Sequence, residues 1–362
     1  MNVFSPDWVS PPGDSISQLM KRKNKNVNTL SSVTGFSEEK INSILSGKEK
    51  INIKFAQSIS KELGGSVEFW LKREKDYREN NIRIISSFKD WVDSFPYSDL
   101  AKYGWVDATS NVLERYHNLL DYFSSDSIDE WDSRYMGLLS ETSYRVSNSF
   151  DSDSYSVVAW LTKAKRELNE KALGVWDSKN LEGRLQEIKA LTRKKDPEVF
   201  IPELEKILNE VGVSLSIIPT PKGCSLSGAT FKSEIGNPII LLSSRYLSDD
   251  QFWFTLFHEI GHVLLHGDRE LILEGGMVDE IIEKEADEFS SLQLIPLNYI
   301  DELNKITVRD WKKIPRLAKK IGVSSGVVLG QLQHRGVIPV SHLNKLKVRY
   351  KWNRDNRLTL KD

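Results

Sequence analysis

The chain has 362 residues, enough for two or three domains and a sizeable hydrophobic core. Its 50 lysine and arginine residues nearly balance its 51 aspartate and glutamate residues, so no overall charge draws it to nucleic acid or to a membrane. A single cysteine, the absence of an apolar run of membrane-spanning length, and an N-terminus without signal-peptide character favour a cytoplasmic protein with no disulfide framework.

Residues 14 to 79 have the pattern of five short helices separated by turns, several of which contain glycine. The third of these helices follows Ser37 and ends before Gly47. Together with the helix before it, it gives the plan of a helix-turn-helix motif, in which residues 38–45 would read DNA.

This region resembles the Xre-type DNA-binding domain of HigA-like antitoxins, and the likeness rests on residues 9–14, 44–48 and 66–71. It departs from that pattern at Glu38 and Glu39, because two carboxylates at the start of the reading helix would be repelled by phosphates. A helical module that binds a protein partner is therefore the alternative to DNA binding. The same module is a candidate dimer interface.

Residues 81–196 carry no chemical motif. Their aromatic residues predict a helical layer with a buried aromatic core and no bound ligand; the tryptophans concerned are Trp91, Trp105, Trp131, Trp160 and Trp176. Residues 124–129 and 147–156, which are rich in serine and aspartate, predict loops. A charged segment that ends at Pro197 marks the end of this region.

The next region predicts a small sheet that leads into a long apolar helix. Alternating or apolar runs at residues 213–219, 227–231 and 238–242 predict three strands. The helix that begins after Ser248 and ends before Gly267 has almost no polar face and is therefore expected to be buried. The segment from Ser248 to Gln251 has the spacing of a capping box at its start.

This apolar helix contains His258-Glu259-Ile260-Gly261-His262, the His-Glu-x-x-His sequence of a zincin site. Two imidazoles four residues apart share one face of a helix and can bind one metal ion, whereas Glu259 is turned away and can hold a water at the metal. A chance match, with core histidines bonded to backbone carbonyls, is the alternative. In a zincin, residues 228–231 would be the edge strand that holds an extended substrate.

An acidic helix over residues 278–294 follows a loop that contains Gly275 and Gly276. Two histidines leave zinc under-coordinated, so a third ligand is expected from this helix. Helical periodicity leaves the choice between Glu283 and Glu285 open. Glu283 and Asp287 are one turn apart, so one could bind the metal while the other orients a ligand histidine.

Residues 200–335 resemble an ImmA/IrrE metallopeptidase. The resemblance rests on residues 249–255, on the His-Glu-x-x-His motif and on the run from Glu283 to Pro296. It implies a Zn²⁺ site with the ligands His258, His262 and Glu283 and the general base Glu259.

Residues 304–362 are basic and are predicted to be helical. The sequence is compatible both with a nucleic-acid contact and with a charged face exposed to solvent. Tyr246, His266 and His334 are candidate donors to the transition-state oxyanion, and a helix-capping role is the alternative for His334.

The sequence thus predicts an α+β, mainly helical protein whose zincin-like part has a small three-stranded sheet and a pair of metal-binding helices. The expected domains are a helix-turn-helix domain at 1–80, a helical connecting region at 81–196, a metallopeptidase domain at 197–300 and a basic helical extension at 301–362.

The resemblance implies a zinc-dependent endopeptidase that makes one cut in a helix-turn-helix repressor or antitoxin and so regulates a mobile element, a stress response or a toxin–antitoxin or defence system. The alternative is a HigA-like antitoxin or transcriptional regulator that binds DNA and a toxin, with the zinc domain as a sensor. Operator DNA and a toxin are further candidate partners, and no membrane is expected.

Overall fold

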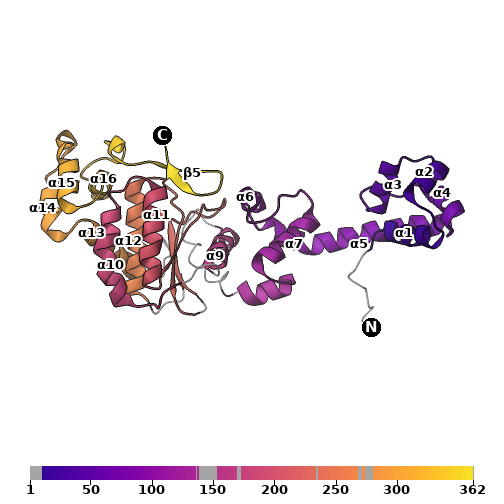
Figure 1. Cartoon of the computed structure of the whole chain (residues 1–362), viewed down its shortest axis with the longest axis horizontal. Coiled ribbons are helices and arrows are strands. Elements are labelled where there is room, and N and C mark those ends of the chain that lie inside the picture. The colour runs from indigo at the N-terminus through magenta and orange to yellow at the C-terminus, as the bar shows by residue number, and fades with distance from the viewer. Residues whose placement is uncertain are drawn as a thin grey trace. The chain divides into compact units, whose positions relative to one another are not determined.

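The computed structural model describes residues 10–135, 137, 153–168, 173–233, 235–267, 271–273 and 280–361. Its contacts divide the chain into two compact units (Figure 1). The N-terminal unit comprises residues 1–93 and 110–116, and the C-terminal unit comprises residues 94–109 and 117–362. Among the described residues, no helix is both long and apolar enough to cross a membrane.

The N-terminal unit contains the five helices that the sequence predicts: α1 (Pro12–Arg22), α2 (Val27–Thr34), α3 (Glu38–Leu45), α4 (Ile53–Leu63) and α5 (Val67–Asp93). Asparagine and serine side chains at Asn26, Ser37 and Asn52 accept hydrogen bonds from the first turns of α2, α3 and α4. The fifth helix is much longer than predicted and continues across residue 80. A small apolar core, which includes Phe55 and Trp70, joins the helices.

The C-terminal unit contains a sheet and a larger number of helices. They are α6 (Tyr97–Lys102), the end of α7 (Val112–Phe123), α9 (Ser154–Leu168), α10 (Ser178–Leu191), α11 (Pro197–Glu210), α12 (Asp249–Leu265), α13 (Glu280–Leu294), α14 (Ile300–Asn304), α15 (Lys313–Ile321) and α16 (Ser325–His334). Trp131 and Trp160 are fully buried, as the sequence predicts, whereas Trp105 and Trp176 are only partly covered.

The sheet has the strand order β1-β3-β2-β4, with bounds β1 (Ser214–Ile217), β2 (Gly228–Lys232), β3 (Pro238–Leu242) and β4 (Leu271–Leu273). The three predicted strands are present as β1, β2 and β3. β1 is parallel to β3, whereas β2 is antiparallel to both of its neighbours. A separate hairpin pairs β5 (Tyr350–Trp352) with β6 (Leu358–Leu360).

The prediction that residues 228–231 form an edge strand is wrong. They lie in β2, which is paired with β3 on one side and with β4 on the other. β4 falls in the stretch that the sequence suggested was a loop, because a run of three apolar residues is too short to display a strand period. The edge strands of the described sheet are therefore β1 and β4.

The sheet is covered on both faces, and alternate residues of its strands serve the two cores (Figure 1). Leu215, Ile240 and Leu242 pack with the helices α10 to α13 in the larger core. Ile239 and Leu241 point the other way and pack against residues of α9. This double burial explains why β3 is buried along its whole length.

The start of α12 differs from the predicted capping box, because the Ser248 side chain makes no cap hydrogen bond. Instead, Asp249 accepts hydrogen bonds from the Ser324 hydroxyl and the Val348 backbone N–H. The neighbouring Asp250 forms a buried ion pair with Lys347 at 2.6 Å. Burial raises the pKa of Asp249 to about 6 in spite of the bond from Ser324.

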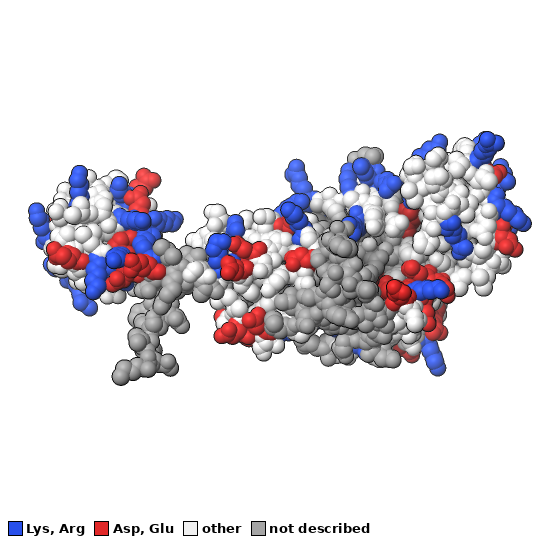
Figure 2. Space-filling model, turned by 180° about the vertical axis from the view of Figure 1, so that it is seen from behind, with Lys and Arg blue, Asp and Glu red and all other residues white. Residues whose placement is uncertain are grey.

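Charged side chains of both signs are mixed on the N-terminal unit, as Figure 2 shows. In the C-terminal unit, lysines and arginines gather at the end that carries α14 and α15. Two of these lysines are already paired: Lys313 with Asp310 and Lys320 with Glu302. This distribution favours a solvated face for α15 over a continuous nucleic-acid contact.

Candidate metal centre

The predicted site residues come from α12 and α13. His258 and His262 are one helical turn apart and almost completely buried, and their Nε2 atoms are 3.0 Å from each other. Glu283 of α13 reaches both rings: its carboxylate oxygens lie 3.3 Å from His258 Nε2 and 3.4 Å from His262 Nε2. The structure therefore brings the three predicted ligands to one point.

The spacing of these atoms suits a small divalent ion. Nitrogen and oxygen ligands of tetrahedral zinc lie about 2.0–2.2 Å from the metal, so they are roughly 3.3–3.6 Å from one another. The nitrogen–oxygen distances of 3.3 and 3.4 Å match this spacing, and the nitrogen–nitrogen distance is a few tenths of an ångström shorter. Two imidazoles and a carboxylate are also the donor types that zinc prefers.

A close approach of the two helices makes this convergence possible. At Gly261 of α12, a Cβ atom would lie 3.1 Å from the Phe289 ring and 3.3 Å from the Ala286 Cα of α13. Glycine at this position therefore lets α13 lie against α12 without a gap. The fully buried Ala286 extends the contact.

A second layer of side chains orients the two histidines. Asp287 lies 2.9 Å from His258 Nδ1. On the other ring, His262 Nδ1 lies 3.1 Å from His266 Nδ1, and His266 Nε2 in turn lies 2.9 Å from Glu285. Both ligand rings thus use Nδ1 for these contacts and turn Nε2 to the centre, which is the usual arrangement of metal-binding histidines.

These contacts also separate the two candidates for the third ligand. Glu283 faces both imidazoles, whereas Glu285 is exposed and contacts His266. Helical angles place Glu285 near the apolar face of α13, but they do not include the way α13 packs on α12. The structure therefore favours Glu283.

The charged and polar groups around the site favour the binding of a cation. Burial by itself would lower the pKa of His258, but hydrogen bonds to Asp287 and Glu283 and the charge of Glu259 outweigh burial and raise it to about 11. Burial would raise the pKa of Glu283, but the two imidazoles lower it to about 2. For His262, burial dominates and lowers the pKa. A bound metal would therefore take the place of a proton on His258.

Glu259 lies on the side of α12 that faces the sheet, and it is completely buried. The Thr230 hydroxyl of β2 donates a hydrogen bond to its Oε2 at 2.6 Å. At Gly228 of the same strand, a Cβ atom would lie only 2.2 Å from Glu259 Oε1. The sequence analysis predicted neither the hydrogen bond from Thr230 nor the close approach at Gly228, although a glycine inside a strand is a known signal of close approach.

The three candidates for an oxyanion donor occupy two different places. His266 is engaged with His262 and Glu285. Tyr246 and His334 line a cavity of about 340 Å³ near the start of α12, and none of the metal-site residues lines it. The Phe254 ring neighbours both His334 and the site: its centroid is 5.9 Å from the His334 ring and 6.4 Å from the His258 ring.

Comparison with known proteins bears on this region. Residues 209–333 match the family described as the IrrE N-terminal-like domain, Peptidase_M78. A stretch of 108 residues is 32% identical to the radiation response metalloprotease IrrE of Deinococcus deserti; it covers 28% of this chain and 38% of that protein. The chain thus spans less than half of the relative that it matches. These similarities support the ImmA/IrrE family for the C-terminal region of the chain, the region that carries the metal centre.

Proposed function

We propose that the protein is a zinc-dependent endopeptidase that cuts a helix-turn-helix repressor or antitoxin at a specific site. The observation that carries this proposal is the convergence of His258, His262 and Glu283 on one point, with Glu259 buried beside it. The relative from Deinococcus deserti is also named a metalloprotease.

In this proposal, each residue of the site has a distinct role. Zinc, when bound by the two histidines and Glu283, would acidify a water and polarise the scissile carbonyl. Glu259 is the general base that takes the proton from the attacking water and passes it to the leaving amine. The Thr230 hydroxyl holds one of its oxygens, so the carboxylate is oriented before substrate arrives. Tyr246 and His334 are the remaining candidates for the oxyanion donor.

The proposed substrate class comes from the resemblance to ImmA/IrrE metallopeptidases, and the N-terminal unit supports it. We infer that α2 and α3 form a helix-turn-helix around the turn at Gly35, which has a left-handed backbone conformation. Such a unit brings the peptidase to its operator or to a partner of similar fold. The radiation response in the relative's name supports a stress-related target.

The decisive test is a comparison of new N-termini. Cell extract is incubated with the zinc-loaded parent chain, with Glu259→Gln and with Glu288→Gln, an exposed acid on α13 that serves as the matched control. We expect a small set of cleavage sites with the parent and the control, concentrated in one helix-turn-helix protein, and none with Glu259→Gln. The same N-termini in all three samples would overturn the proposal.

A second candidate function is a transcriptional regulator with a zinc-containing sensor domain. It is favoured by the five-helix unit with its capped α3. Glu38 and Glu39 in the first turn of α3 weaken it. If Glu259→Gln retains repression of a reporter operon and the parent chain forms no cleavage product, the regulator function is supported and the peptidase function is excluded.

A further inference from the structure

The cavity of about 340 Å³ near the start of α12 is formed by three separate stretches of the chain. These stretches are the segment that leads into α12, the end of α16, and residues 340–349. A volume of this size is at the lower end of the range for small ligand sites, about 300–1,000 Å³, so the cavity can take a single side chain of a bound protein.

The charges of the lining residues indicate which side chain would fit. The acidic and basic residues among them are Asp250, Lys347 and Arg349. Asp250 and Lys347 form a buried ion pair at 2.6 Å, so their charges cancel. Arg349 is exposed, and in the part of the chain that the structure describes its guanidinium makes no ion pair or hydrogen bond. The uncancelled charge is therefore positive, and a guanidinium can bind a carboxylate through two parallel hydrogen bonds.

The backbone around Arg349 is fixed to the start of α12. The Asp249 backbone N–H donates a hydrogen bond to the Val348 carbonyl at 3.0 Å, and the Val348 N–H donates to Asp249 Oδ1 at 2.9 Å. On the other side of Arg349, the Tyr350 N–H donates to the Leu247 carbonyl at 2.9 Å. Both chain neighbours of Arg349 are thus bonded to residues where the metal-binding helix begins, so the fold sets the position of Arg349 relative to the metal centre.

One face of α12 connects the cavity with the metal centre. Gln251, Phe254 and His258 are three and four residues apart, so they share this face. Gln251 lines the cavity, and His258 is one of the three candidate metal ligands. Gln251 is exposed and Phe254 is half-buried, so an extended polypeptide can lie along this face.

The length of this path corresponds to a few residues of an extended chain. The Phe254 ring centroid is 5.9 Å from the ring of His334, which lines the cavity, and 6.4 Å from the ring of His258. The rings of His334 and His258 are therefore at most about 12 Å apart, a distance that three to four residues span at about 3.3–3.6 Å each. A chain held at the metal centre would thus reach the cavity with a side chain three to four residues away.

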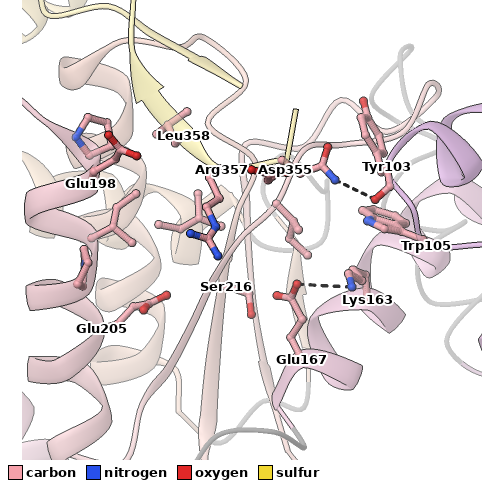
Figure 3. Close-up of a pocket in the computed structure, with 16 residues that line it drawn as sticks. Tyr103, Trp105, Lys163, Glu167, Glu198, Glu205, Ser216, Asp355, Arg357 and Leu358 are labelled. Carbon is pink, nitrogen blue, oxygen red and sulfur yellow. Dashed lines mark hydrogen bonds and ion pairs between the residues drawn. The ribbon is translucent and has the colours of Figure 1, made fainter. Parts of the chain in front are cut away.

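A larger cavity, of about 910 Å³, lies at β1 (Figure 3). Two interactions join residues that line it: the ion pair between Lys163 and Glu167, and the hydrogen bond from the Asn356 side chain to the Tyr103 carbonyl. Among the described residues that line this cavity, none belongs to α12 or α13. It is therefore not part of the path along α12 to the metal centre.

We propose that the smaller cavity is a specificity subsite for an acidic side chain, aspartate or glutamate, that lies three to four residues from the cleaved bond and pairs with Arg349. This inference rests on the proposed peptidase function and adds to it a feature of the sequence that is cut. Arg349 is then the residue that determines this specificity, whereas the Asp250–Lys347 pair is a wall of balanced charge.

The test anchors peptides at the zinc of the loaded full-length chain through a hydroxamate group, so that affinity is measured without cleavage. Two series of alanine peptides cover both directions of a bound chain, one with a C-terminal hydroxamate and one with an N-terminal malonyl hydroxamate. In each series, a single glutamate is placed one to six residues from the hydroxamate, and glutamine at the same position gives the neutral partner. The ratio of the two affinities, measured by calorimetry, isolates the effect of the charge.

We expect glutamate to bind about three- to tenfold more tightly than glutamine at a spacing of three to four residues in one series, and equally well at the other spacings. Arg349→Gln should remove this preference, and Arg349→Glu should reverse it, because like charges then meet. The matched control is Arg354→Glu, an exposed residue of the turn between β5 and β6 that does not line the cavity, and it should leave the preference unchanged.

Equal affinities of the glutamate and glutamine peptides at every spacing, or a preference that survives Arg349→Glu, would overturn the subsite. The proposed function fails in a different way, through a parent chain that binds the hydroxamates but generates no N-termini that depend on Glu259. If no hydroxamate peptide binds to the zinc-loaded chain, the metal centre is closed to an extended chain and the subsite is overturned as well.

Discussion

Replacing Gly228 by alanine tests whether the position of Glu259 determines the rate. The new Cβ atom would lie 2.2 Å from Glu259 Oε1, whereas ordinary contacts begin near 3.4 Å. The carboxylate must therefore move by about 1.2 Å, since the Cβ is fixed to the backbone of an interior strand. A misplacement of about 1 Å can cost on the order of 100-fold in rate, or about 2.7 kcal/mol of activation free energy.

The assay measures the rate of appearance of the N-termini that depend on Glu259, together with zinc content and thermal stability. We expect Gly228→Ala to lose about 100-fold in kcat/KM and to keep its zinc, because the three atoms nearest to the new methyl group all belong to Glu259 and not to a metal ligand. Gly183→Ala is the matched control, since a Cβ on this exposed α10 glycine meets no atom within 4 Å. A parental rate in Gly228→Ala with full zinc content would refute the reasoning.

Three further predictions concern the surroundings of the site. In competition titrations with a chelator, Glu283→Gln should lose far more zinc affinity than Glu285→Gln, because only Glu283 faces both imidazoles. Asp287→Asn should weaken zinc binding by about 10–100-fold, since it removes the carboxylate that orients His258. Asp249 has a folded pKa of about 6, above its ordinary 3.8, so its stabilising effect is present below pH 3.8 and is lost as the pH rises through 6. Asp249→Asn should therefore gain about 2 kcal/mol relative to the parent between pH 4 and pH 7 in denaturant titrations, and a constant difference would contradict this.

Local signals were sufficient for much of the fold. Capping residues and glycines mark the short helices of the N-terminal unit, and alternation or apolar runs mark β1 to β3, because these signals lie within a few residues of the elements they define. The His-Glu-x-x-His motif is local in the same sense, since one helical turn separates its histidines.

The features that the sequence could not supply depend on distant segments. β4 pairs with β2. The prediction that residues 228–231 form a strand is therefore confirmed, whereas the prediction that this strand lies at the edge of the sheet is wrong. The start of α12 is held by Val348, about a hundred residues later, in place of a capping box. Glu283 faces the histidines because of how two helices pack at Gly261.

The most direct test of the central claim is the X-ray absorption spectrum of zinc in the loaded full-length chain. We expect about one zinc per chain, bound by two imidazole nitrogens and one carboxylate oxygen at about 2.0–2.2 Å, with one further light atom from solvent. Glu283→Gln should change this spectrum, and Glu285→Gln should not. A fourth protein ligand, a sulfur ligand from Cys224, or zinc far below one per chain would contradict the account.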